Sequence, residues 1–201
     1  MAKTSINKIP NIITIIRIFL VIPIVSLLIY VQIKKSSNFN YQDSTIWAFY
    51  TAFALFLIAS FSDYLDGKIA RAYKISSTFG KIFDPIADKI LINITLVAFV
   101  GIGIIPWFFV VVFIARDIVV DGCRIVIVHH KIEVGASIWG KAKTLMQIIA
   151  ISILFIFSPM TGGKEWVYWV LNIPIVIAIW LSNISAFLYI KPIWKYLFKP
   201  L

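Results

Sequence analysis

The chain has 201 residues, of which 61% are hydrophobic and 14% charged, and its mean hydropathy is +0.94. Ordinary soluble domains are about 45–50% apolar, so this composition excludes a soluble globular protein and indicates an integral membrane protein. The net charge of +10 is spread between apolar runs rather than gathered in a basic arm. We therefore expect no nucleic-acid partner.

Apolar runs predict six membrane-spanning helices, because a helix needs about 20 apolar residues to cross the hydrocarbon of a bilayer. The expected spans are residues 12–33, 45–71, 82–104, 106–129, 142–159 and 166–190. The predicted fold is an all-α integral membrane protein with six transmembrane helices, forming a single membrane domain over residues 1–201. Gly101 and Gly103, followed by Pro106, predict a tight turn between the third and fourth spans.

The basic residues predict the orientation of these helices. Six spans place both termini on one side of the membrane. With the N-terminus in the cytoplasm, only Lys34, Lys35 and Lys164 of the nineteen basic residues lie outward. The positive-inside rule therefore predicts a cytoplasmic N-terminus.

Four of the nine acidic residues lie at the end of the second expected span and the start of the third. Asp63 and Asp66 are three residues apart, and Asp84 and Asp88 are four apart, so each pair presents its carboxylates on one helix face. A hairpin of the two helices would bring the pairs together. Pro85 is expected in the first turn of the third span, where a missing N–H does little harm.

Four carboxylates close together at membrane depth require compensating cations, because like charges repel strongly in a low dielectric. Carboxylate oxygens suit hard ions such as Mg²⁺ or Mn²⁺. The pattern therefore predicts a divalent-metal site, with two ions as the simplest arrangement, that would polarise a diphosphate. The alternative is that the aspartates cap helices or pair with Lys68, Arg71, Lys81 and Lys89 at the membrane surface.

Small residues and one arginine accompany the aspartates. Gly67, Gly80 and Ala70 leave room for a ligand or another backbone, and Arg71 offers a planar fork to a phosphate. The whole pattern is Asp63-x-x-Asp66-Gly67-x-x-Ala70-Arg71, eight residues, and Gly80-x-x-x-Asp84-x-x-x-Asp88. It resembles the CDP-alcohol phosphotransferase signature at every defined position, and we call these eight residues the aspartate signature.

The resemblance implies a role for each signature residue. Asp63, Asp66 and Asp84 would be metal ligands, and Asp88 would lie near the metals as the base that acts on the acceptor hydroxyl. Gly67, Ala70, Arg71 and Gly80 would hold the cytidine diphosphate together with Asp63 and Asp66. Asn11 and Thr14 share a helix face with Arg17 and are further candidates for the nucleotide site, although a helix start beside lipid headgroups is the alternative.

Outside the signature, most of the chain resembles the bacterial phosphatidylglycerophosphate synthase branch of this family. The supporting stretches are residues 9–17, 83–89, 115–124 and 139–144. The resemblance implies CDP-diacylglycerol as donor and sn-glycerol 3-phosphate as acceptor. It also implies a homodimer in the bacterial cell (inner) membrane, with a polar cavity and active site opening to the cytoplasm.

Basic residues inside the later spans favour a phosphorylated acceptor. Arg116 lies about ten residues inside the fourth span, Arg124 two turns later, and Lys141 and Lys143 open the fifth. Charged groups at such depth face a cavity or a partner, and an acceptor phosphate requires cations. Internal pairing of the arginines with Asp117 and Asp121, or lysines that reach the interface, is the alternative.

Three other functions are compatible with the sequence. The first is the same reaction with another acceptor, such as inositol phosphate, serine or phosphatidylglycerol. The second is a small cation transporter, which also places carboxylates and arginines inside a helix bundle. The third is a non-catalytic membrane scaffold. Neither of the last two requires Gly, Ala and Arg at the fixed positions of the aspartate signature.

Overall fold

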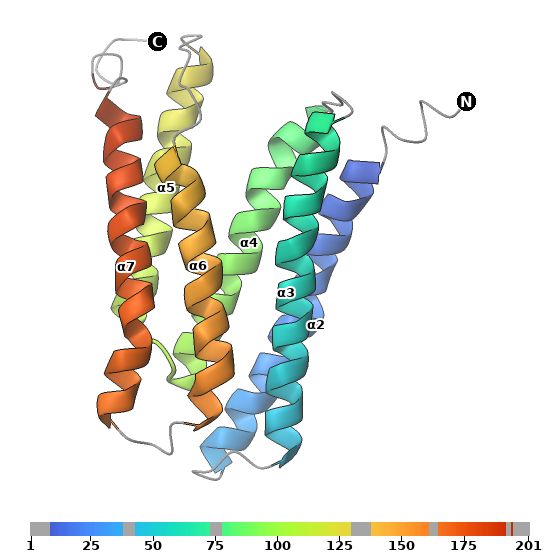
Figure 1. Cartoon of the computed structure of the whole chain (residues 1–201), viewed down its shortest axis with the longest axis vertical. Coiled ribbons are helices and arrows are strands. Elements are labelled where there is room, and N and C mark those ends of the chain that lie inside the picture. Colours follow the sequence, from blue (N-terminus) through green and yellow to red (C-terminus); the bar gives the residue numbers. More distant parts are fainter. Residues whose placement is uncertain are drawn as a thin grey trace. The chain divides into compact units, whose positions relative to one another are not determined.

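The computed structural model describes residues 9–37, 43–72, 78–129, 138–160, 165–191 and 194. The side chains of residues 9–10, 36–37, 43–44, 63–72, 78–82, 124–125 and 128–129 lie outside this description. Six α-helices account for nearly all of the described residues (Figure 1). They are α2 (Ile9–Ser37), α3 (Asp43–Ala72), α4 (Thr78–Ile102), α5 (Trp107–His129), α6 (Ile138–Phe157) and α7 (Glu165–Ile190), with a 3₁₀ turn, η1 (Ser158–Met160), after α6.

The all-α prediction is confirmed, and each expected span coincides with one helix to within four residues at either end. Among the described residues, five helices contain segments that are long and apolar enough to cross a membrane, so the chain is a multi-pass membrane protein. They are Asn11–Lys35, Thr45–Ser62, Phe83–Ile102, Ile138–Met160 and Glu165–Ile190. Charged residues interrupt the apolar sequence of α5, whose 23 residues are nevertheless as long as a span requires. The count of six spans therefore stays a prediction.

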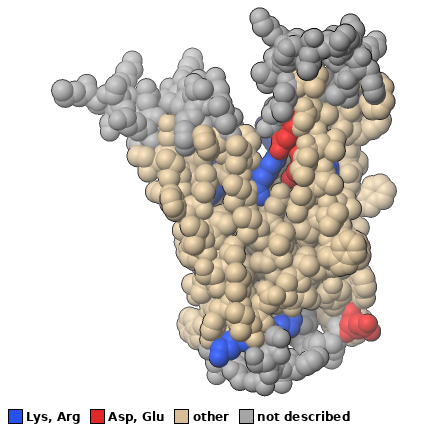
Figure 2. All heavy atoms as spheres, turned by 180° about the vertical axis from the view of Figure 1, so that it is seen from behind, with Lys and Arg blue, Asp and Glu red and all other residues tan. Residues whose placement is uncertain are grey.

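Large apolar side chains remain exposed along the helices. Phe19 is 63% exposed, Trp180 68% and Phe187 68%. On the face drawn in Figure 2, uncharged side chains cover most of the described surface. Extended apolar surface of this kind is unfavourable in water, whereas lipid chains solvate it without cost.

The chain divides into two compact units, residues 1–104 and residues 105–201. In the first unit, α2 packs against both α3 and α4 (Figure 1). The buried side chains of α2 recur every three or four residues, as Val21, Ile24, Leu28 and Val31, which forms one packed stripe along the helix. Phe49 of α3 and Phe99 of α4 stack with their ring centroids 6.0 Å apart.

In the second unit, α7 packs against both α5 and α6. The buried face of α7 is built from small residues, among them Ala178, Ser182 and Ser185. A side-chain carbon added at Gly140 of α6 would lie 3.8 Å from the Ser185 hydroxyl. Small residues let membrane helices approach closely, so this face brings α6 against α7.

The helix α4 begins earlier than its hydropathy predicts. It starts at Thr78, four residues before the expected span, and Pro85 is its eighth residue. The prediction that Pro85 lies in the first turn is wrong, because the helix extends beyond the apolar segment and hydropathy does not mark that extension. A proline inside a helix leaves the carbonyl four residues earlier without its N–H partner, here the carbonyl of residue 81.

The tight turn predicted between the third and fourth spans is present. Gly103 has a φ of +78°, its N–H bonds the carbonyl of Val100 at 2.9 Å, and the N–H of Ile104 bonds the carbonyl of Phe99 at 2.8 Å. These two bonds form a Schellman motif, which ends a helix with a left-handed residue. Glycine adopts this conformation at the lowest cost.

We predict that Gly103→Ala destabilises the protein by about 1–2 kcal/mol, because an L side chain is strained at this φ. Gly122→Ala in α5 is the matched control. At both positions an added carbon meets nothing within 4 Å, but only Gly103 has a positive φ. Gly122→Ala should leave stability unchanged or raise it by up to about 1 kcal/mol. Thermal unfolding in detergent, followed by tryptophan fluorescence, measures both changes, and equal shifts would contradict the conformational explanation.

Candidate active site

The backbone of the aspartate signature lies in the last turns of α3 and the first turns of α4. Asp63 directly follows the apolar segment Thr45–Ser62, and Asp84 is the second residue of the segment Phe83–Ile102. Because α3 and α4 run antiparallel within one unit (Figure 1), the signature lies at a single end of that unit. This end is where the apolar segments give way to polar sequence.

The side chains of the α3 residues in the signature lie outside the described structure. They are Asp63, Asp66, Gly67, Ala70 and Arg71. Gly80, in the first turn of α4, also lies outside the part of the structure whose side chains are described. Their roles in binding metal and nucleotide therefore stay predictions. The structure establishes that all of these residues are on helices, as the three- and four-residue spacings require.

The structure describes both aspartates of α4, and one of them is bonded to α2. Asp84 and Asp88 are half-buried and one helical turn apart. The hydroxyl of Thr14, which is fully buried, donates a hydrogen bond of 2.6 Å to Oδ1 of Asp84. A hydrogen bond to an ionised carboxylate is shorter and stronger than a neutral one. The bond brings α2 to the signature and orients the Asp84 carboxylate.

The same face of α2 carries a buried arginine. Arg17 is 1% exposed and lies three residues after Thr14, while Asn11 is half-buried three residues before it. A guanidinium buried among apolar helices requires anionic or hydrogen-bonding neighbours. The sequence predicts that this shared face, Arg17 included, borders the nucleotide site, and that role stays a prediction. The signal is a charge deep inside the apolar segment Asn11–Lys35, far from the two lysines at its end.

The described side chains can be tested against the predicted metal. Within the described part of the chain, no group of three or more His, Cys, Asp or Glu residues converges. Asp84 and Asp88 supply two of the four expected carboxylates, and α3, which carries the other two, packs in the same unit. Carboxylate oxygens in this number are the donors that Mg²⁺ and Mn²⁺ prefer, so the donor set fits such ions chemically.

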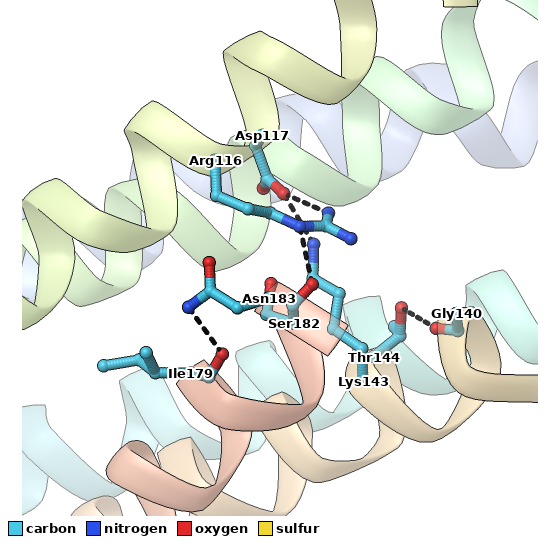
Figure 3. Close-up of polar contacts among 8 residues, drawn as sticks. All are labelled: Arg116, Asp117, Gly140, Lys143, Thr144, Ile179, Ser182 and Asn183. Atoms are coloured by element: carbon cyan, nitrogen blue, oxygen red, sulfur yellow. Dashed lines mark hydrogen bonds and ion pairs between the residues drawn. The ribbon is translucent and has the colours of Figure 1, made fainter. Parts of the chain in front are cut away.

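A second polar cluster joins the three helices of residues 105–201 (Figure 3). Oδ1 of Asp117 accepts bonds from Nη1 of Arg116 at 2.9 Å and from Nζ of Lys143 at 2.6 Å. Nε of Arg116 also donates to the backbone carbonyl of Ser182 at 2.9 Å. The cluster therefore links α5, which carries Arg116 and Asp117, to Lys143 of α6 and Ser182 of α7. We call these four residues the ion-pair cluster.

The ion-pair cluster carries an excess of positive charge. Asp117 is 4% exposed and Lys143 is 8% exposed, so both charges are largely removed from solvent. Arg116 and Asp117 form the internal pair that was the alternative to a phosphate site. Lys143 shares the same carboxylate, so these three side chains carry two positive charges and one negative charge. An anion in the neighbourhood would therefore be attracted to the cluster.

The four basic residues expected at the acceptor site are not equivalent in the structure. Arg116 and Lys143 are brought together by Asp117. Lys141 is exposed, two residues before Lys143 on α6, and residues two apart do not share a helix face. The side chain of Arg124 lies outside the description, although its backbone is part of α5.

Two buried polar residues of this region were missed by sequence reasoning. Gln147 lies four residues after Lys143 on α6 and is 3% exposed, and Ser182 of α7 is 1% exposed. Gln147 could have been found, because residues four apart share a helix face. Ser182 gives a weaker signal, since small hydroxyl residues also serve as packing residues in membrane helices.

Comparison with known proteins assigns the chain to a family. A sequence model of the CDP-alcohol phosphatidyltransferases matches residues 7–181. The chain belongs to the CDP-alcohol phosphatidyltransferase family. The family match extends over both compact units and contains the whole aspartate signature. Family membership is therefore not carried by the signature alone.

Curated members of this family are similar to the chain over most of its length. A protein of Mycoplasma pneumoniae is 36% identical over 96% of this chain and 90% of its own length. One of Rickettsia felis is 33% identical over 94% of this chain and 97% of its own, and one of Bacillus subtilis is 32% identical over 94% and 96%. All three are named CDP-diacylglycerol–glycerol-3-phosphate 3-phosphatidyltransferase. The family relationship predicted from the sequence is confirmed.

We predict that Asp117→Asn destabilises the protein more than Lys143→Met does. The first change leaves two neighbouring buried cations without their carboxylate, which costs about 3–5 kcal/mol when a buried partner is removed. The second leaves the neutral Arg116–Asp117 pair intact and should cost only about 1 kcal/mol, the value of a typical hydrogen bond. Thermal unfolding of both variants in the same detergent measures the order. The reverse order would show that Asp117 does not stabilise the two cations.

Proposed function

We propose that this chain transfers a phosphatidyl group from CDP-diacylglycerol to sn-glycerol 3-phosphate, giving phosphatidylglycerol phosphate and CMP. The observation that carries the proposal is the complete aspartate signature at one end of the α3–α4 hairpin. The names of the relatives and the positively charged ion-pair cluster favour glycerol 3-phosphate over uncharged acceptors.

The donor site in this proposal is formed by the first unit. Asp63, Asp66, Asp84 and Asp88 would hold divalent metal, Mg²⁺ or Mn²⁺ and two ions in the simplest case. When bound, the metal would neutralise the diphosphate and make CMP a better leaving group. The bond from Thr14 supports this assignment, because it holds one ligand carboxylate in place before any ligand binds.

The nucleotide would lie beside these carboxylates. Gly67, Ala70, Arg71 and Gly80 would surround the cytidine diphosphate, with Asn11 and Thr14 of α2 on the neighbouring side. Support comes from α2, which packs on α4 and whose Thr14 contacts the signature directly. The buried Arg17 on the same face also supports the proposal, because it would supply a cation to compensate the diphosphate.

The acceptor phosphate would bind to basic residues of the second unit. Arg116, Arg124, Lys141 and Lys143 are the proposed contacts. Arg116 already donates through Nε to Ser182 and through Nη1 to Asp117. Its third guanidinium nitrogen, Nη2, would therefore donate to the acceptor phosphate. Lys143 and Arg116 share a single carboxylate, and the excess charge of the cluster is what a phosphate would compensate.

The reaction would be a direct displacement at phosphorus. Asp88 takes the proton of the 1-hydroxyl of glycerol 3-phosphate as that oxygen bonds to the β-phosphorus of the donor. The bond between this phosphorus and the bridging oxygen breaks, and CMP leaves with the electron pair. Holding the two substrates in line supplies a large share of the rate. The residues of both units would act together as a single membrane domain.

The proposal includes the membrane setting of this reaction. We propose a bacterial inner-membrane protein with a cytoplasmic N-terminus and an active-site cavity open to the cytoplasm, as the distribution of basic residues favours. A homodimer is part of the proposal by analogy with the family. CDP-diacylglycerol would reach the site from the bilayer, and glycerol 3-phosphate from water.

The proposed function is tested with purified protein, labelled CDP-diacylglycerol and a panel of acceptors. We predict CMP release that requires glycerol 3-phosphate, stops when EDTA removes divalent metal, and returns with Mg²⁺ or Mn²⁺. Release with inositol phosphate, serine or phosphatidylglycerol, but not with glycerol 3-phosphate, would assign another acceptor. No CMP release with any acceptor would favour transport or a structural role.

We predict that Asp88→Asn lowers kcat by about 10²–10⁴-fold, the usual contribution of a general base. The amide keeps the size of the side chain but accepts no proton. Mn²⁺ binding, measured by electron paramagnetic resonance, separates loss of the base from loss of the metal site. Wild-type turnover in a variant that binds metal normally would eliminate Asp88 as the base.

We predict that Lys143→Met raises KM for glycerol 3-phosphate by about 10-fold or more, since a charged hydrogen bond to phosphate contributes roughly 1.5–3 kcal/mol. KM for CDP-diacylglycerol should stay unchanged. Lys34→Met is the control, because Lys34 is exposed in the last turn of α2. The bond from α2 to the aspartate signature comes from Thr14, near the opposite end of that helix. An unchanged KM for glycerol 3-phosphate in Lys143→Met would mean that the phosphate binds elsewhere.

A further inference from the structure

Two buried polar side chains, one in the ion-pair cluster and one a helical turn from it, have polar atoms without hydrogen bonds. They are Nε2 of Gln147 and Oγ of Ser182, neither of which finds a partner among the described residues. Both side chains are more than nine-tenths buried. A buried donor without a partner is costly, so native structures rarely keep one unless another group meets it.

The hydroxyl of Ser182 differs from most hydroxyls of the described helices, although Ser60 of α3 is another buried serine without a partner there. Ser26 donates to the carbonyl of Ile22, and Ser152 donates to the carbonyl of Ile148, in each case four residues earlier. This bond is the usual way in which a membrane helix satisfies a serine. Ser182 has the same opportunity in α7 but does not use it. Its hydroxyl is therefore available for a group from outside the helix.

The positions of the two side chains place them beside the cations of the cluster. Gly140 of α6 lies against Ser185 of α7, and the two helices run antiparallel (Figure 1). Lys143 is three residues after Gly140, and Ser182 is three residues before Ser185, so Lys143 and Ser182 lie at the same level of the two antiparallel helices. Gln147 is one turn further along α6. In Figure 3 the Lys143 ammonium, the Asp117 carboxylate and the Arg116 guanidinium converge next to the backbone of Ser182.

We infer that Gln147 and Ser182 bind the 2-hydroxyl of the acceptor glycerol 3-phosphate and select against acceptors that lack it. The inference rests on the proposed function, because the cations of the cluster would hold the phosphate of the same molecule. An amide N–H donates to a hydroxyl oxygen, while a serine hydroxyl both donates and accepts. Together they satisfy a hydroxyl group, and neither has a charge that would compete for the phosphate.

A hydroxyl-binding site of this type discriminates strongly. When the substrate lacks the hydroxyl, the buried groups lose their partner, and the enzyme rejects the analogue more effectively than a purely apolar pocket can. The cluster alone recognises any phosphate. Gln147 and Ser182 would add recognition of the carbon that lies between the phosphate and the attacking hydroxyl.

The test compares glycerol 3-phosphate with 1,3-propanediol monophosphate, which differs only by the missing 2-hydroxyl. We expect the wild-type enzyme to prefer glycerol 3-phosphate by about 10-fold or more in kcat/KM. Gln147→Met and Ser182→Ala should each lose about 10-fold with glycerol 3-phosphate and less than about 2-fold with the analogue. Their inhibition by inorganic phosphate should stay as in the wild type, since the cations are unchanged.

Ser152→Ala is the matched control for the serine change. Ser152 is a half-buried serine of α6 whose hydroxyl is already bonded within its own helix, so the preference for glycerol 3-phosphate should persist. Gln147→Asn provides a second variant at the glutamine, with the same amide on a shorter side chain. It should also lose activity selectively with glycerol 3-phosphate.

Three results would overturn the inference. One is a wild-type preference below about 2-fold, and another is an equal loss with both substrates in the variants, which would indicate a structural role. The third is a preference that survives in all three Gln147 and Ser182 variants. Failure of the proposed function is distinguishable, because the wild-type enzyme would then release no CMP with glycerol 3-phosphate at all.

Discussion

The carboxylate of Asp117 is the interaction on which the second half of the molecule depends. It accepts bonds from Arg116 and Lys143, and Arg116 continues the connection to the backbone of α7. Apolar helices in lipid gain little from the hydrophobic effect when they pack together, so a shared polar contact contributes much to their specific arrangement. One anion thereby joins three helices. Because two cations share it, the same contact gathers positive charge among the three helices.

The bond between Thr14 and Asp84 has a comparable role in the first unit. It joins the beginning of α2 to the beginning of α4, where the apolar segments end. In both units, a buried carboxylate or hydroxyl thus fixes helices close to the residues that would do chemistry. The groups that hold the helices together are therefore neighbours of groups proposed to bind substrate.

The helices themselves could be predicted, because hydrocarbon requires every backbone polar group to be bonded within the chain and leaves long apolar helices as the solution. The position of the aspartate signature on two helices could also be predicted, from its three- and four-residue spacings. The early start of α4 could not, since its first turns lie outside the apolar segment and Pro85 suggested a helix beginning. The Thr14–Asp84 bond and the pairing of Asp117 with both Arg116 and Lys143 could not be predicted either, because they depend on how separate helices pack. The difference between Lys141 and Lys143 was predictable from helix geometry, since residues two apart point in different directions.

The position of the signature at the ends of apolar segments has a further consequence. Asp63 follows directly after one segment, and Asp84 lies at the start of the next, so the proposed donor site would lie near the lipid headgroups. A lipid donor diffuses in two dimensions and meets such a site without leaving the membrane. The relevant donor concentration is then its mole fraction among the surrounding lipids, so that dilution with inert lipid slows encounter even when the bulk amount is constant. The membrane is thus the medium that sets the supply of one substrate.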